Sequence, residues 1–299
     1  MPQKYKVLIT GSSGMLGVDL WKELKRDYKI IGLDVTHNSK LTTHNFHKCD
    51  ITNRQDTLAI IKKLQPDVVI HTAAYTDVDG CEINFEKAYK INSEGTKNVA
   101  LACKTVNAIL IYISTDFVFD GKKKNPYKEN DKTRPLSVYA DSKLKGEKAI
   151  QEILKRYFIL RTSWLYGKHG KNFVDTILQK AKEEKILKVV DDQIGSPTYT
   201  RNLAEAIHAL LKKVTRAQEH KSTSYGIYHV SNSGSVSWFE YAKEILRLRG
   251  LKTKVIPISS QELARPARRP AMSVLDNSKF IKYTGYKMRN WMEALKKYV

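Results

Sequence analysis

The fold of this 299-residue chain is decided near its start, by the stretch Lys6-Val7-Leu8-Ile9-Thr10-Gly11-Ser12-Ser13-Gly14-Met15-Leu16-Gly17. The residues before the first glycine are typical of a short buried strand, and leucines then recur at helical spacing. A strand, a glycine-rich turn and a helix in this order open a Rossmann unit. In such a unit Gly11 permits the tight turn, Gly14 lets the backbone approach a pyrophosphate, and Gly17 lets the helix pack closely on the strand.

The glycine spacing is G-x-x-G-x-x-G, which is also compatible with a plain tight loop. The context favours a dinucleotide site, because a second strand over residues 29–33 ends at Asp34. An acid there accepts hydrogen bonds from ribose hydroxyls and repels a 2′-phosphate, which favours NAD. The alternative for Asp34 is an ordinary loop acid. His37, Asn38 and Ser39 are candidates to contact a 2′-phosphate.

Composition excludes several classes of protein. No run of about 18 apolar residues is present, so the sequence predicts no membrane span, and the first residues lack the apolar core of a signal peptide. The cysteines, Cys49, Cys81 and Cys103, are odd in number and lack metal-ligand spacing, so we expect reduced thiols in a cytoplasmic protein. The sequence identifies no metal-ligating residues and leaves open whether a divalent metal binds at a dimer interface.

The net charge of +21 comes from 52 Lys and Arg residues against 31 Asp and Glu residues. Such a charge favours anionic partners, either nucleic acid or a nucleotide-linked substrate. The densest groups, Lys122–Lys124 and Arg265–Arg269, lack the interleaved aromatic residues of a stacking surface for nucleic acid. We interpret most of the charge as a solvated surface and expect no specific nucleic-acid binding.

The next part of the chain alternates strands and helices. Strands are predicted at 67–71, 109–113 and 157–161, and a capping box of Thr52 and Gln55 predicts a helix over 53–64. A long helix is predicted over roughly 84–106. This alternation predicts an α/β fold, a Rossmann doubly wound parallel sheet with right-handed crossovers.

Beyond residue 165 the alternation loosens, which predicts a smaller C-terminal α/β substrate-binding lobe over 166–299. The NAD(P)-binding Rossmann domain is expected over 1–165. Strands are predicted at 187–190 and 226–230, with helices at 201–213 and 238–249, and part of the range from about 187 to 232 is expected to return to the Rossmann core. Residues 216–224 are expected to form a polar loop.

Tyr139 and Lys143 lie four residues apart on a predicted helix and therefore share one face. A free tyrosine, with a pKa of about 10, is a weak acid–base group at neutral pH, and a nearby ammonium lowers that pKa. The pair follows Ser114-Thr115-Asp116, which a buried strand delivers to the ligand crevice of the sheet. A solvated helix face is the alternative for an isolated Tyr-x-x-x-Lys pair.

The sequence resembles the extended short-chain dehydrogenase/reductases, and within them the dTDP-4-dehydrorhamnose reductase family. The resemblance covers nearly the whole chain. The superfamily motifs are Gly11–Gly17, Ser114–Gly121 and Tyr139 with Lys143. The narrower family is indicated by Ala73–Asp79, Arg161–Trp164, Asp192–Thr198 and Arg265–Pro270.

This resemblance implies reduction of a nucleotide-sugar ketone by NADPH or NADH, with Tyr139 as proton donor, Lys143 on the nicotinamide ribose and Thr115 on the reacting oxygen. The implied substrate contacts, besides Thr115, are Asp116, Trp164, Arg268 and Arg269. The implied cofactor contacts, besides Tyr139 and Lys143, are Gly11, Gly14, Met15, Leu16, Gly17, Asp34, Asp50, Ile51, Ala73, Ala74, Tyr75 and Thr76.

Alternatives remain open for several of these residues and for the function. From spacing alone Asp50 is equally well a loop carboxylate, Trp164 a core side chain, and Arg268 and Arg269 part of a basic surface. The chain is also similar to the β subunit of methionine adenosyltransferase, a dinucleotide-binding partner protein that needs no proton donor. A reductase or epimerase of another nucleotide sugar is a further alternative. A homodimer is expected.

Overall fold

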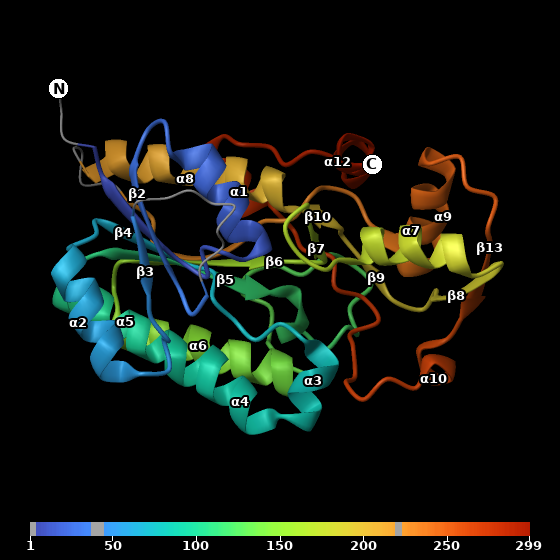
Figure 1. Ribbon diagram of the computed structural model, residues 1–299, viewed down its shortest axis with the longest axis horizontal. Coiled ribbons are helices and arrows are strands. Elements are labelled where there is room, and N and C mark those ends of the chain that lie inside the picture. The colour runs from blue at the N-terminus through green and yellow to red at the C-terminus, as the bar shows by residue number, and fades with distance from the viewer. Residues whose placement is uncertain (1–3, 37–44, 219–222) are drawn as a thin grey trace.

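The computed structural model describes residues 4–36, 45–218 and 223–299 of the chain, and the side chains of 216–218 are not described. A seven-stranded sheet, parallel throughout, forms the centre of the molecule in the order β11-β6-β5-β4-β1-β2-β3 (Figure 1). Its strands are β1 (Lys6–Thr10), β2 (Lys29–Asp34), β3 (Phe46–Lys48), β4 (Val68–His71), β5 (Ile109–Thr115), β6 (Tyr157–Thr162) and β11 (Gly226–His229). The predicted α/β class and parallel Rossmann sheet are confirmed.

Helices cover both faces of the sheet (Figure 1). Helices α1 (Met15–Leu24) and α8 (Thr200–Gln218) pack on one face. Helices α2 (Arg54–Leu64), α5 (Thr96–Thr105) and α6 (Val138–Ile153) pack on the other. Because both faces are buried, β4 and β5 are buried at every residue, as a doubly covered parallel strand should be.

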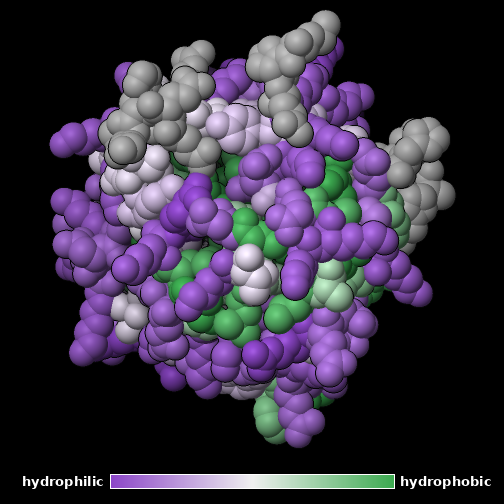
Figure 2. Space-filling model, turned by 90° about the vertical axis from the view of Figure 1, so that its left-hand side faces the viewer, coloured by the Kyte–Doolittle hydropathy of each residue, from purple (hydrophilic) through white to green (hydrophobic). Residues whose placement is uncertain are grey.

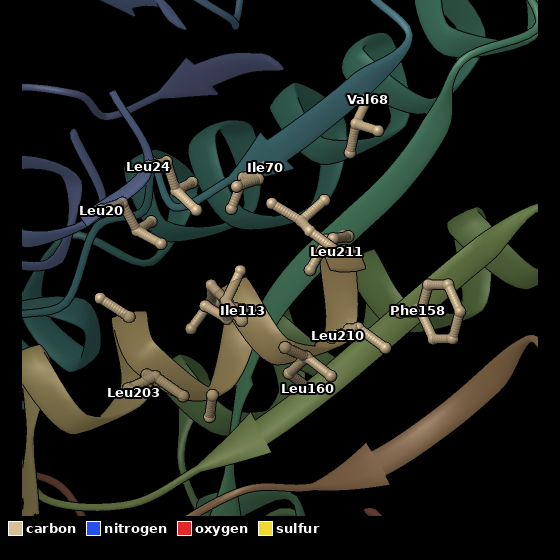
Figure 3. Close-up of a cluster of buried hydrophobic side chains, with 14 of the residues drawn as sticks. Leu20, Leu24, Val68, Ile70, Ile113, Phe158, Leu160, Leu203, Leu210 and Leu211 are labelled. Carbon is tan, nitrogen blue, oxygen red and sulfur yellow. The ribbon is translucent and has the colours of Figure 1, made fainter. Parts of the chain in front are cut away.

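The core under α1 and α8 consists of aliphatic side chains at helical spacing that meet those of the strands (Figure 3). Leu20 and Leu24 of α1 and Leu203 and Leu210 of α8 are fully buried, as is Phe158 of β6. Burial of each such side chain contributes roughly 1.5–3 kcal/mol, so this layer holds the two helices firmly on the sheet.

A second region, which we call the lobe, lies beside the sheet (Figure 1). It contains three two-stranded pairs, β10–β7, β12–β9 and β13–β8, and the helices around them share a separate hydrophobic cluster. Its strands are β7 (Leu165–Tyr166), β8 (Ile186–Val190), β9 (Ile194–Gly195), β10 (Thr198–Tyr199), β12 (Val236–Ser237) and β13 (Lys254–Ile258). Its helices are α7 (Phe173–Glu183), α9 (Trp238–Leu248), α10 (Ser260–Leu263) and α12 (Trp291–Tyr298). Helix α11 (Ser278–Thr284) instead packs Phe280 into the core under α8.

Within the range expected to return to the core, β11 joins the seven-stranded sheet beside β6, and α8 packs against α1. Strand β8 does not return, because it pairs in parallel with β13 inside the lobe. Helix α8 continues to Gln218, so the loop predicted from residue 216 begins later than expected. The division at residue 165 stays a prediction.

Two further predictions of secondary structure need correction. The sequence over residues 36–47 predicts a polar loop, but its last two residues belong to the short edge strand β3, which pairs with β2 although only Phe46 is apolar. The cap of α2 is Asn53, whose side chain accepts a hydrogen bond from Asp56 N, so Thr52 and Gln55 do not form the predicted capping box.

The long helix predicted over 84–106 is interrupted. Helices α3 (Val78–Ile83) and α4 (Phe85–Tyr89) are followed by a π-helical turn, η1 (Lys90–Gly95), before α5 begins. The wider turn carries Asn92, which accepts a hydrogen bond from Tyr75 N at 2.8 Å and donates to Ser142 Oγ at 3.0 Å. Such turns are frequent at functional sites, and this one fixes the loop that follows β4.

Within the part of the chain that the structure describes, no helix is both long enough and apolar enough to cross a membrane. Figure 2 shows a face that is mostly hydrophilic, with hydrophobic side chains gathered toward its middle. The interpretation of the high positive charge as a largely solvated surface stays a prediction.

Candidate active site

A cavity of about 1290 Å³ lies between the carboxyl ends of the sheet strands and the lobe. Typical small-molecule pockets measure about 300–1,000 Å³, so this one has room for two ligands side by side. The sheet side supplies the glycine turn after β1, the ends of β2, β4, β5 and β6, and the start of α6. The lobe supplies Phe173, Lys188, Trp238, Arg265 and Arg269, among others.

The glycine turn fits a dinucleotide pyrophosphate. Gly11 has φ +67°, and a Cβ there would lie 2.7 Å from Ala73 N. Gly14 precedes α1 without any side-chain cap, so the first N–H groups of the helix stay available to an anion. Gly17 does not line the cavity, since a Cβ there would meet Gly11 O at 2.3 Å; its role is close packing.

Two carboxylates line the cavity beyond the glycine turn. Asp34 accepts hydrogen bonds from Ser13 N at 3.0 Å and from Val35 N at 2.8 Å, which fixes the carboxylate at the end of β2. Asp50 accepts from Thr52 N at 2.9 Å, in front of α2. His37, Asn38 and Ser39, the candidates for a 2′-phosphate contact, lie outside the described residues.

Most of the remaining expected cofactor contacts also line this part of the cavity, namely Met15, Leu16, Ile51, Ala73, Ala74 and Thr76. Tyr75 does not. Its backbone is held by Asn92, and its ring lies 4.8 Å from the Lys87 ammonium. Tyr75 therefore shapes the loop rather than facing the ligand space.

Thr115, Asp116 and Tyr139 meet at the carboxyl end of β5. The Thr115 hydroxyl donates to Asp116 Oδ1 at 3.1 Å and accepts from Phe117 N at 3.2 Å. The Tyr139 ring packs edge-on against Phe117, with ring centroids 6.1 Å apart. Burial raises the pKa of Asp116 to about 7 despite its hydrogen bonds, so this carboxyl group is partly protonated at neutral pH.

Lys143 sits behind Tyr139 and is itself buried. Its Nζ donates to Ile113 O at 2.7 Å and lies 4.2 Å from the centre of the Tyr112 ring. Burial lowers the pKa of Lys143 to about 7, although the Glu147 carboxylate opposes the shift. Lys143 is therefore close to its protonation midpoint at neutral pH.

The expected lowering of the Tyr139 pKa by Lys143 is not found. Burial, together with the negative charge of Asp116, raises the pKa of Tyr139, and a hydrogen bond to Thr115 only partly offsets this. The expectation considered the ammonium charge but not the loss of water around the phenol. Tyr139 consequently holds its proton at neutral pH, in the form that a proton donor requires.

Trp164 lies at the lobe end of the cavity in a strained backbone conformation, with φ +46°. Its ring stacks on Trp238, with centroids 3.4 Å apart and an angle of 5° between the planes. Phe173 lies 4.4 Å from Trp238, also by ring centroids. A Cβ at Gly195 would come within 2.4 Å of the Trp164 ring, so only glycine fits beneath it. The result is an aromatic surface on one side of the cavity.

Of the two arginines expected to contact the substrate, Arg268 and Arg269, only Arg269 lines the cavity. Arg269 lines the cavity and forms a two-point ion pair with Asp79, at 3.0 and 2.9 Å. Arg265, which was not proposed, also lines the cavity and contacts Asp79 at 3.2 Å. Arg268 is exposed and does not line the cavity, whereas its neighbour Ala267 donates its backbone N–H to Asp79 at 3.2 Å.

Sequence reasoning missed Trp238, Phe173, Arg265 and Asp79. Trp238 begins α9 directly after its cap, Ser237, and that position could have indicated an exposed aromatic ring. The pairing of Asp79 with Arg269 joins segments 190 residues apart in the sequence, and no local pattern signals it.

The parallel sheet with a glycine turn, together with Thr115, Tyr139 and Lys143 at the strand ends, defines an extended short-chain dehydrogenase/reductase. Comparison with known proteins narrows this class. The family model for the RmlD substrate binding domain matches residues 5–299. The spore coat polysaccharide biosynthesis protein SpsK of Bacillus subtilis is 41% identical over 295 residues, covering 98% of this chain and 96% of that protein.

The dTDP-4-dehydrorhamnose reductase of Escherichia coli is 34% identical over 299 residues, covering 97% of this chain and 96% of that protein. The crystal structure of dTDP-4-dehydrorhamnose reductase from Bacillus anthracis in complex with NADP has a TM-score of 0.86 and 40% identity, with 99% of each chain covered. The chain belongs to the dTDP-4-dehydrorhamnose reductase (RmlD) family, whose members are NAD(P)-dependent nucleotide-sugar reductases.

Proposed function

We propose that this protein reduces the C4 ketone of dTDP-4-dehydro-L-rhamnose to give dTDP-L-rhamnose, with NADPH or NADH as the reductant. The observation that carries the proposal is the position of Tyr139: a protonated phenol beside Thr115, facing a cavity large enough for a dinucleotide and a nucleotide sugar. Relatives named dTDP-4-dehydrorhamnose reductase, 34–38% identical over nearly the full length, support this choice of substrate.

The cofactor fits the sheet side of the cavity. The pyrophosphate would rest on the N–H groups after Gly14, where a side chain at Gly11 would be blocked by the chain at Ala73. Asp34 would accept hydrogen bonds from the adenosine ribose, and Lys143 would hold the nicotinamide ribose. When bound, the reduced nicotinamide supplies a hydride to the C4 carbon of the sugar.

The side chains of the protein supply the proton and the orientation. As the ketone carbon gains hydride, negative charge develops on its oxygen, and the Tyr139 hydroxyl gives its proton to that oxygen. The Thr115 hydroxyl would turn from Asp116 and donate its hydrogen bond to the same oxygen, which stabilises the developing charge. The balanced outcome is one hydride on carbon and one proton on oxygen.

The lobe would bind the rest of the substrate. Arg265 and Arg269 present guanidinium groups that suit a diphosphate, and Lys188 adds a third positive charge. Trp164 and Trp238 offer flat faces to the sugar or the base.

The test is oxidation of NADPH and NADH by the purified protein with dTDP-4-dehydro-L-rhamnose, beside UDP- and GDP-linked 4-keto sugars. The proposal predicts turnover with the dTDP-sugar and a kcat/KM for it at least tenfold above that for the others. A preference for a UDP- or GDP-sugar would contradict the substrate and favour the reductase of another nucleotide sugar. Cofactor binding without turnover of any sugar would favour the regulatory subunit.

A further inference from the structure

An ion pair is buried behind the candidate active site, away from any ligand. Glu147 of α6 and Arg161 of β6 join through two hydrogen bonds, at 3.0 and 2.7 Å, and both side chains are almost fully buried. The Ser114 hydroxyl donates a third hydrogen bond to Glu147, at 2.5 Å. Buried ion pairs can often be replaced by apolar residues without loss of stability, so stability alone does not explain this one.

Glu147 links helix α6 and strand β5, which carry the reacting groups, to the neighbouring strand β6. It lies eight residues after Tyr139 and four after Lys143, so the three side chains follow one face of α6. Ser114 directly precedes Thr115 at the end of β5, and Arg161 directly precedes Thr162 at the end of β6. One carboxylate therefore ties the helix to both strand ends.

The Glu147 carboxylate is also the anionic group that acts on Lys143. The other groups facing Lys143 are neutral or positive: the Tyr112 ring, the Ile113 carbonyl oxygen and His71 of β4. Burial lowers the pKa of His71 to about 3, so this histidine stays neutral. Tyr139 is protonated, and Arg161 is held by Glu147 itself. Asp116 acts on the Tyr139 phenol from the opposite side.

We propose that Glu147 is a positioning residue for the reductase site, which holds α6 on the ends of β5 and β6 and stabilises the charged form of the buried Lys143 side chain. The catalytic part of this inference rests on the proposed function. The effect of Glu147 on the protonation of Lys143 is independent of the proposed function, because it follows from the contacts within the chain. Within the described residues, Glu147 is the carboxylate that raises the pKa of Lys143 against the effect of burial.

The direct test is the titration of Lys143 in the full-length protein, followed by the ¹³Cε chemical shift of labelled lysine and assigned with Lys143→Met. In Glu147→Gln we expect the midpoint of Lys143 to fall by about one pH unit or more. The activity–pH profile for the dTDP-sugar should move in the same direction. An unchanged midpoint would overturn the proposal whether or not the protein reduces that sugar.

Glu147→Gln leaves Arg161 without its carboxylate and could impair folding. The double variant Glu147→Gln/Arg161→Met removes both charges and leaves no unpaired buried ion. It therefore tests the effect of the Glu147 carboxylate on the Lys143 midpoint in a folded protein. A purely structural ion pair predicts a wild-type Lys143 midpoint in the double variant, whereas our proposal predicts a lowered one. The matched control is Glu244→Gln, which removes a two-point ion pair with Arg247 on the surface of α9. It should leave the Lys143 midpoint and the activity–pH profile unchanged.

Discussion

The seven-stranded sheet and the lobe build their sides of the same cavity in opposite ways. The sheet side offers groups at the end of the fully buried strand β5 and on helix α6 beside it, and both Thr115 and Lys143 are buried and fixed by hydrogen bonds. The lobe offers groups mainly on a loop and at the starts of helices: Arg265 and Arg269 lie between α10 and α11, and Trp238 begins α9. Buried groups acquire shifted pKa values and suit proton transfer, whereas exposed cations and rings suit binding. The comparison assigns chemistry to the sheet and recognition to the lobe.

The largest effect is expected from Tyr139→Phe, which removes only the hydroxyl. Turnover should fall by roughly 10²–10⁴-fold, the usual contribution of a general acid, while cofactor affinity stays nearly the same. Steady-state kinetics and a cofactor titration measure the two quantities. Wild-type turnover in this variant would remove Tyr139 from the mechanism.

A large effect of another kind is expected from Arg269→Ala in the lobe. Loss of charge-assisted hydrogen bonds to a diphosphate, about 1.5–3 kcal/mol, should raise the KM for the nucleotide sugar about 10–100-fold with little change in kcat. Arg268→Ala, an exposed neighbour, is the matched control and should behave as wild type. An equal rise in KM in both variants would mean that Arg269 contributes only general positive charge at the surface, which would contradict a specific contact with the diphosphate.

Lys143→Met should weaken cofactor binding by about tenfold at neutral pH, since one charge-assisted hydrogen bond is lost. In the wild type, a pKa of about 7 means that Lys143 loses its proton, and cofactor affinity decreases, as the pH rises through 7. The cofactor affinity of Lys143→Met should not decrease in this way as the pH rises through 7. Titrations from pH 6 to pH 9 test the point, and a step of equal size in both proteins would contradict the role of Lys143.

The smallest effect concerns stability. The His71 ring lies between the hydroxyls of Thr10 and Thr96, and burial lowers its pKa to about 3. A histidine in the unfolded chain has a pKa of about 6.5. The unfolded chain therefore binds more protons below pH 6.5, and the folded state is destabilised as the pH falls from there toward 3. His71→Gln should lessen the loss of unfolding free energy between pH 6 and pH 5 by about 1 kcal/mol. Equal losses in both proteins would contradict a neutral His71.

The sheet could be predicted from the sequence because its determinants are local. Continuous apolar strands such as β5 and the glycine turn after β1 are readable without knowledge of their partners. Strand β3 was missed because only its pairing with β2 makes it a strand. The π-turn was missed for a similar reason: its geometry lets Asn92 accept a hydrogen bond from Tyr75 N and donate one to Ser142, and both partners are distant in sequence.

The candidate site divides in the same way. Tyr139 and Lys143 are visible as a helical spacing, but the direction of the Tyr139 pKa depends on burial and on Asp116, which only the folded chain reveals. In the lobe, the choice between Arg265 and Arg268 depends on Asp79, a residue from the other side of the cavity. Long-range ion pairs have no periodic signal, so sequence alone could not select the right arginine.

The division of labour is tested most directly by single-turnover hydride transfer, followed by nicotinamide absorbance, at saturating cofactor and saturating dTDP-4-dehydro-L-rhamnose. Wild type and Arg269→Ala should transfer hydride at similar rates once the sugar saturates, and Tyr139→Phe should be slower by about 10²-fold or more. A rate in Arg269→Ala as low as that in Tyr139→Phe, or a wild-type rate in Tyr139→Phe, would contradict the assignment of chemistry to the sheet and recognition to the lobe.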